Sequence, residues 1–312
     1  MLISRIAYLI LKENIFSDKI LAVTFTKKAA EEMKTRLGVL LQKSNVKNPP
    51  SLHGTSLSTR DTGSSVGARR KTFSSGVTCT TLHSFCTGIL RSYDVINPDF
   101  TIYDDADSMK IIAALMKEKK VFDEDGVAVS ARAVYGALST IKRQMLKRIG
   151  YQFVDPVFQI ANDLMRDYNQ VLRDNNARDF DDLILDTLNI LLRNGPAAHS
   201  LRAQYSHVLC DEWQDVDKSQ YCLLTLLTDD SRRRLHFGPD IDNYVRVNNL
   251  FEIKSKGKEE DDIQSGRNVV NDPEVEQRPR TLFVVGDSFQ TIYSWRGADN
   301  KNMDYFATDF PG

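Results

Sequence analysis

The spacing of apolar and polar residues along the chain changes between two patterns, and each predicts one kind of element. Short apolar runs that resemble buried strands occur at 20–24, 77–81, 208–210 and 282–285. Segments with apolar residues three or four positions apart predict helices at 1–11 and 29–41, and a further helix opens at His83. Together these patterns indicate an α/β protein with a parallel sheet flanked by helices.

The middle of the chain, residues 106–192, has a helical pattern almost throughout. Two apolar stripes are typical of helix faces in a core rather than of a cofactor site: Val134, Leu138, Ile141, Met145 and Ile149, then Val157, Ile160, Leu164, Tyr168 and Val171. A basic flank accompanies the first stripe: Lys142, Arg143, Lys147 and Arg148. We therefore expect this region to form a largely helical unit.

Two segments, 43–76 and 228–280, lack either period. The first is rich in Ser, Thr, Gly and Asn and contains a basic triplet at 69–71, and the second contains KSKGKEEDDIQSGRN. Such composition predicts flexible surface insertions that leave the sheet undisturbed.

Composition limits the function classes. With 41% hydrophobic and 27% charged residues, the 312-residue chain has the balance of a soluble globular protein. A net charge of −1 gives no overall basic signature, so a nucleic-acid site must be a local patch. No apolar run approaches a membrane span, and we expect no membrane partner. The four cysteines form no CxxC pair and are interpreted as reduced packing thiols.

Acidic residues follow two of the predicted strands. Asp211 and Glu212 come directly after 208–210, and Asp287 follows 282–285 and Gly286. The carboxyl edge of a parallel sheet is where α/β proteins bind ligands. One acid there can hold Mg²⁺ while the other orients or deprotonates a water molecule. The alternative is a strand end followed by a helix-capping aspartate, but the second strand-plus-acid unit favours a site.

Five motifs then carry a family resemblance. DEWQD (211–215) and VVGDSFQTIYSWRGA (284–298) resemble the second and third motifs of the UvrD/Rep/PcrA-like DNA helicases of superfamily 1. ILAVTFTKKAAEEM (20–33), TTLHSFCTGILR (80–91) and DFDDLI (179–184) agree in the same order. The resemblance implies a RecA-like P-loop NTPase sheet in a discontinuous ATP-binding domain formed by 1–95 and 200–312, with an all-helical subdomain, residues 96–199, inserted into it. It also implies an ATP-dependent 3′-to-5′ DNA helicase that acts in repair or recombination.

The same resemblance implies roles at an ATP site, with ATP and Mg²⁺ as cofactors. Asp211 would anchor Mg²⁺, and Glu212 would be the base that positions the attacking water. Gln290 would sense the γ-phosphate, and Arg296 would add positive charge to the cleft. The residues present would therefore supply a metal ligand, a base and a sensor.

Further residues would face DNA, either a single strand or a 3′-tailed duplex. By resemblance these are Phe25, Thr26, Thr81, His83, Ser84, Tyr293 and Trp295. Aromatic side chains would stack on bases, which suits a motor because stacking tolerates any sequence. The alternative for Phe25, Tyr293 and Trp295 is ordinary core packing, and a lone histidine such as His83 is more often structural.

One departure from the family leaves two hypotheses open. The motif GxxxxGK[ST] does not occur in the 312 residues, and we expect the phosphate loop just before Met1 and a second motor domain after Gly312. The chain is then a fragment of a helicase, inactive by itself, or an inert remnant that binds DNA or protein. A nuclease-helicase subunit is a third alternative. The insertions favour a eukaryotic member in the nucleus, with cytoplasm or an organelle as alternatives, and repair or recombination proteins as partners.

Overall fold

The computed structural model describes residues 1–43, 76–93, 96–121, 129–145, 152–228, 280–291, 298 and 301–310. The two predicted insertions fall almost wholly outside the described residues, and so do Tyr293, Trp295 and Arg296. Within the described part of the chain, no helix has the length and apolar character needed to cross a membrane.

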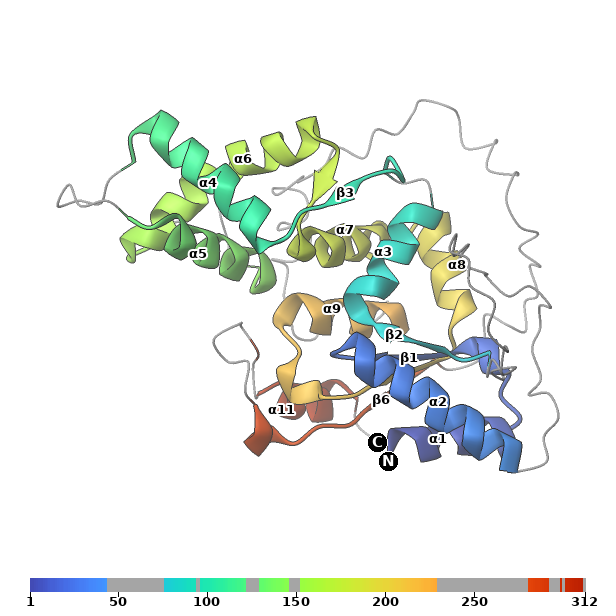
Figure 1. Ribbon diagram of the computed structural model, residues 1–312. Helices are drawn as coiled ribbons and strands as arrows, with labels where there is room; N and C mark the ends of the chain where they lie inside the picture. The colour runs from blue at the N-terminus through green and yellow to red at the C-terminus, as the bar shows by residue number, and fades with distance from the viewer. Residues whose placement is uncertain are drawn as a thin grey trace, which may run out of the picture.

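The centre of the fold is a four-stranded parallel sheet in the order β2-β1-β5-β6, which confirms the predicted α/β class (Figure 1). Its strands are β1 (Ile20–Thr24), β2 (Thr78–Thr81), β5 (His207–Cys210) and β6 (Thr281–Val284). The bounds lie within one residue of those predicted. β5 begins earlier than its apolar run because His207 is itself buried and pairs with Ile20 on one side and Thr281 on the other.

Helices cover both faces of the sheet, as alternate side chains of β1 show. Ile20 and Ala22 pack into a core with α1 (Leu2–Leu11) and α2 (Lys27–Lys43). Leu21 and Val23 face the opposite way, as successive strand residues must. They join a second core formed with α3 (Leu82–Ser92), α7 (Phe180–Arg193), α8 (Pro196–Gln204) and α9 (Lys218–Thr228).

A helical lobe with its own core stands beside the sheet (Figure 1). Its helices are α4 (Asp105–Lys119), α5 (Ala131–Arg143) and α6 (Pro156–Asp174). The two predicted stripes meet there, with Val134, Leu138 and Ile141 of α5 against Leu164 and Tyr168 of α6. Met145 belongs instead to the core of the sheet, and Ile149 lies outside the described residues. The pattern did not reveal β3 (Thr101–Ile102) and β4 (Ala177–Arg178), since two residues are too few to show a period.

The helical segment divides between two cores. α7, although part of the same helical pattern as α4 to α6, packs on the sheet with α3, α8 and α9. Periodicity identifies the apolar face of a helix but not its partner, which explains why the pattern did not separate them. The domain bounds at residues 95 and 199 stay a prediction. The last described helix, α11 (Asn302–Asp309), packs on the turn η2 (Trp213–Asp215).

Candidate functional site

The carboxyl ends of β5 and β6 bring two acidic turns to one edge of the sheet. Asp211 follows Cys210 directly, and its backbone N–H donates to the Val23 carbonyl at 3.0 Å. Asp287 lies three residues beyond Val284. Because β5 and β6 are parallel neighbours, both acids emerge at the same edge.

Glu212 occupies a strained backbone conformation. Its φ of 53° and ψ of 45° lie in the left-handed region, which costs a non-glycine residue about 1–3 kcal/mol. The surroundings impose this turn: the Trp213 N–H donates to the Val285 carbonyl at 3.0 Å, and the Asp215 N–H donates to the Glu212 carbonyl at 2.9 Å. The Trp213 side chain is fully buried and its indole N–H donates to the Asn302 carbonyl at 3.1 Å. The turn therefore anchors Trp213 while Glu212 stays exposed.

The buried Gln214 side chain joins the two acidic turns. Its Oε1 accepts the Asp287 backbone N–H at 3.0 Å, which fixes the amide orientation because that N–H requires an oxygen. Its Nε2 consequently points to Glu212 and donates to Oε2 at 2.7 Å. Gly286 permits this approach, since a Cβ there would lie 2.5 Å from Gln214 Oε1.

Gln290 extends this connection. It lies at the end of the short turn η4 (Ser288–Gln290), and its Nε2 donates to Asp287 Oδ2 at 2.9 Å. Hydrogen bonds thus run from Glu212 through Gln214 and Asp287 to Gln290. A change in the position of Gln290 can therefore be passed to Glu212 through the side chain and backbone N–H of Asp287 and then the side chain of Gln214.

The edge acids fit a divalent cation but not a phosphate chain. Burial, followed by the charge of Glu212, raises the pKa of Asp211 above its ordinary value, and an adjacent cation would oppose both causes. Mg²⁺ commonly uses one or two protein carboxylates and takes its other ligands from water and phosphates. No group of three or more His, Cys, Asp or Glu residues that could hold a metal occurs among the described residues. A glycine-rich phosphate loop with a lysine is absent from the sequence.

A cavity of about 440 Å³ lies at the same edge, where β1, β2 and β5 end. Five predicted site residues line it: Phe25, Thr81, His83, Ser84 and Asp211. Residues that the sequence separates by almost two hundred positions therefore share one cavity. Thr26 is exposed beside it, at the start of α2.

The predicted hydroxyls have structural partners as well. Thr26 Oγ1 accepts the Ala29 N–H at 3.1 Å, at the start of α2. Thr81 is the N-cap of α3, where Oγ1 accepts the Ser84 N–H at 3.3 Å and donates to Ser84 Oγ at 2.9 Å. A hydroxyl has a single hydrogen to donate. Thr81 has used its hydrogen, whereas these contacts leave those of Thr26 and Ser84 available for a ligand.

Phe180 is a site residue that the sequence analysis did not single out. It lines the cavity and is 37% exposed, although it is large and apolar. Its ring meets the His83 ring edge-on, with centroids 5.9 Å apart. A signal was present in the sequence: Asp179 and Asp182, three residues apart, form a capping box that starts α7 and fixes Phe180 at its first position.

Comparison with known proteins identifies the family of this chain. The sequence model described as UvrD/REP helicase N-terminal domain matches residues 1–242 and 272–311. Similar proteins include the ATP-dependent DNA helicases PcrA of Bacillus subtilis and Staphylococcus aureus, each 28% identical over 98% of this chain. The chain spans about a third of their length, 31% and 32% respectively. The protein therefore belongs to the family of UvrD/REP helicase N-terminal domains.

Proposed function

We propose that the chain forms the first motor domain of an ATP-dependent DNA helicase that moves 3′ to 5′ along single-stranded DNA. The observation that carries the proposal is the shared cavity, which joins Asp211 of the acidic edge to Phe25 and His83. Family membership and the helicase names of the PcrA relatives support it. Action in repair or recombination, and a nuclear location, stay predictions.

On the nucleotide side, each residue has a role that suits its environment. Mg²⁺ bound with ATP would neutralise charge on the phosphates. The half-buried Asp211 would hold that ion, and the exposed Glu212 would orient the attacking water and accept its proton. Gln290 would respond to the γ-phosphate, and Gln214 would carry its position to Glu212.

On the DNA side, the cavity offers aromatic surfaces for bases and donors for phosphates. Phe25, His83 and Phe180 all line the cavity, and aromatic rings bind bases without sequence preference. Thr26 and Ser84 retain hydroxyl hydrogens, and α2 and α3 both begin at this edge. Helix N-termini favour anions because their backbone N–H groups lack partners in the helix. DNA binding therefore does not require a positive net charge.

The acidic edge and the cavity meet at one residue. Asp211 lies at the end of β5, lines the cavity and is the neighbour of Glu212. A change in the position of this turn would reach both ligands. This arrangement suits a protein that couples nucleotide hydrolysis to movement along DNA.

A second candidate is a DNA-binding module without ATP turnover. The observation in its favour is that GxxxxGK[ST] does not occur in these 312 residues. The two candidates share the DNA cavity. An in-frame GxxxxGK[ST] in the genomic or transcript sequence upstream of Met1 would favour the first candidate, and its absence there would favour the second.

Fluorescence anisotropy with labelled single-stranded DNA tests the part that both candidates share. We expect binding without sequence preference that weakens as salt rises. Phe25→Ala should weaken it by about 1–3 kcal/mol, the value of stacking on one aromatic side chain. Tyr8→Ala is the matched control, because Tyr8 is a half-exposed aromatic on α1, across the sheet from α3. Absence of binding at low salt, or equal losses in the two variants, would contradict the proposal.

A further inference from the structure

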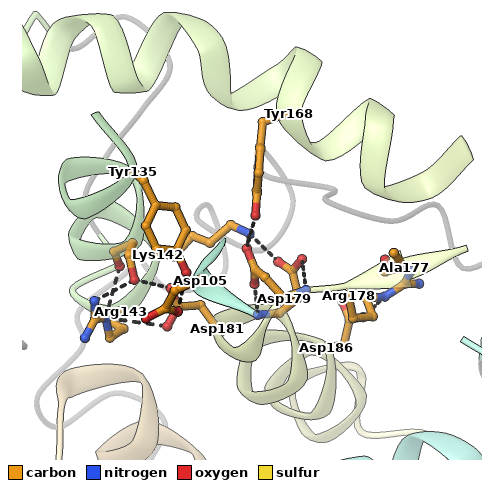
Figure 2. Close-up of polar contacts among 12 residues, drawn as sticks. Asp105, Tyr135, Lys142, Arg143, Tyr168, Ala177, Arg178, Asp179, Asp181 and Asp186 are labelled. Carbon is orange, nitrogen blue, oxygen red and sulfur yellow. Dashed lines mark hydrogen bonds and ion pairs between the residues drawn. The ribbon is translucent and has the colours of Figure 1, made fainter. Parts of the chain in front are cut away.

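The segment 179–182 sends its side chains in two directions. Its three aspartates bond to α5 and α6 of the helical lobe, as Figure 2 shows for Asp179 and Asp181. Phe180, the residue between them, lines the cavity instead. One turn of helix therefore connects the lobe to the proposed DNA site.

Lys142 of α5 is at the centre of the connection. Its Nζ donates to Asp179 Oδ2 at 2.6 Å and to Asp182 Oδ1 at 2.7 Å. The side chains of all three residues are at most 1% exposed. Tyr168 of α6 adds a hydroxyl that donates to Asp179 Oδ2 at 2.9 Å. Because a buried charge requires a close partner, these contacts permit little change in geometry.

A second set of contacts holds the same turn. Asp181 accepts a hydrogen bond from Ser139 and forms an ion pair with Arg143 Nε at 3.5 Å. Asp179 is also the N-cap of α7, and its Oδ1 accepts the Asp182 N–H at 2.8 Å. The start of α7 is therefore fixed both by its own capping box and by α5.

Lys142 is not among the residues that line the cavity, so its effect on a ligand there would be indirect, and the first turn of α7 connects the two. The first residue of α7 is Phe180, whose ring packs edge-on against His83. The position of that ring depends on where α7 begins. α5 and α6 belong to the core of the lobe and α7 to the core of the sheet, so this start is set at the contact between two cores.

We propose that Lys142 is a positioning residue for DNA binding, which holds the first turn of α7 so that Phe180 meets the base beside His83. The inference rests on the proposed DNA site and assigns to the helical lobe a part in shaping it. Loss of Lys142 would leave Asp179 and Asp182 facing each other without a cation. The first turn of α7 would then shift relative to α5, held there only by the contacts of Asp181 with Ser139 and Arg143.

The position of residue 180 can be measured without DNA. The full chain would carry 4-fluorophenylalanine at position 180, and its ¹⁹F resonance would be recorded by NMR. Lys142→Met should shift this resonance towards the solvent-exposed value. If that variant does not fold, Lys142→Met combined with Asp179→Asn and Asp182→Asn removes all three charges while asparagine keeps the cap, and it should show the same shift.

Asp186→Asn provides the matched control. Asp186 is the buried partner of Arg178, with Nε to Oδ2 at 2.7 Å, and lies further along α7. This control breaks the same kind of ion pair in the same helix without touching the contacts of Lys142. It should keep the wild-type resonance. A wild-type resonance in the folded Lys142 variants would overturn the positioning role.

DNA affinity provides the second readout. Lys142→Met should weaken single-strand binding about tenfold, within the range of about five- to 150-fold that one stacked aromatic is worth. In a Phe180→Ala background, the Lys142 substitution should have no further effect. A Lys142 effect that persists without Phe180 would overturn the inference. A wild-type chain that binds no DNA would overturn the proposed function, while the ¹⁹F resonance would still decide the positioning role.

Discussion

The two acidic motifs of this chain, 211–215 and 179–182, are similar in sequence and opposite in environment. In the first, Asp211 is half-buried and Glu212 is exposed at the edge of the sheet. In the second, Asp179 and Asp182 are almost fully buried and bonded to Lys142. An acid at the end of a strand is available to a ligand, whereas an acid that caps a helix under a neighbouring lobe is committed to the fold.

The electrostatics of the two motifs differ in the same way. Burial and the neighbouring Glu212 raise the pKa of Asp211, and the smaller opposing effects of a backbone hydrogen bond and of the amino-terminal charge do not cancel them. Burial also opposes ionisation of Asp179, but the charge of Lys142 outweighs it and lowers the pKa of Asp179. A cation bound beside Asp211 would lower the pKa of that carboxyl group, as Lys142 lowers the pKa of Asp179.

The largest expected effect concerns turnover. The strand-end motif supplies a metal ligand and a base, yet these 312 residues contain no glycine-rich cradle with a lysine for the phosphates. We predict that DNA-stimulated phosphate release by the purified 312-residue chain equals background. Glu212→Gln is the control. Turnover that DNA stimulates and this control abolishes would contradict the prediction.

The next effect concerns stability. Removal of one partner from a buried ion pair costs about 3–5 kcal/mol, so Lys142→Met should lower the free energy of unfolding by that amount in urea titrations. Glu212→Gln, at the exposed acid of the other motif, should change it by less than about 0.5 kcal/mol. Similar losses in the two variants would erase the distinction between the motifs.

A smaller effect is expected for Trp295, which the third motif predicts to face DNA and which lies outside the described residues. Trp295→Ala should weaken single-strand affinity by about 1–3 kcal/mol with little sequence preference. Anisotropy with two oligonucleotides of different sequence measures both quantities. Unchanged affinity in a folded variant would favour core packing for this residue.

The last prediction is a pH dependence at the helix-capping motif. Burial, the charge of Asp179 and the charge of Asp186 outweigh Lys142 and raise the pKa of Asp182 from 3.8 to about 8. Between these values the folded chain binds more protons than the unfolded chain, so this contribution to stability is lost as pH rises. The lowered pKa of Asp179 acts in the opposite direction, but only below about its ordinary value of 3.8, so it leaves this window unchanged.

Asp182→Asn removes the titrating group. The variant should therefore lose less stability than wild type between pH 5 and pH 8, as measured by urea midpoints at the two values. An identical loss in both proteins would show that Asp182 does not titrate in this range.

The sequence predicted the sheet well because a buried strand is a continuous apolar run. β1 matches its predicted bounds, β2 and β5 differ by one residue at their first position, and β6 is shifted by one residue. The motifs also identified residues that the cavity brings together, such as Phe25 and His83. Both successes depend on short-range patterns, which a sequence displays directly.

What the sequence did not reveal depends on contacts between distant segments. The pattern predicts Lys142 as part of a basic flank, yet its side chain is fully buried against Asp179 and Asp182. These partners are almost forty positions away, so the local sequence does not reveal the pairing. The bridging role of Gln214 requires the Asp287 backbone, and the strained turn at Glu212 requires the carbonyl of Val285. No local pattern encodes such partners.

Photo-crosslinking tests the central claim most directly, namely that the carboxyl edge of the sheet is the site of DNA binding. The chain would be bound to single-stranded DNA that contains 5-iododeoxyuridine, irradiated and analysed by peptide mass spectrometry. The account predicts crosslinks in the peptides that contain Phe25, His83 and Phe180, which line one cavity. Crosslinks confined to other peptides, such as the basic triplet at 69–71, would contradict it.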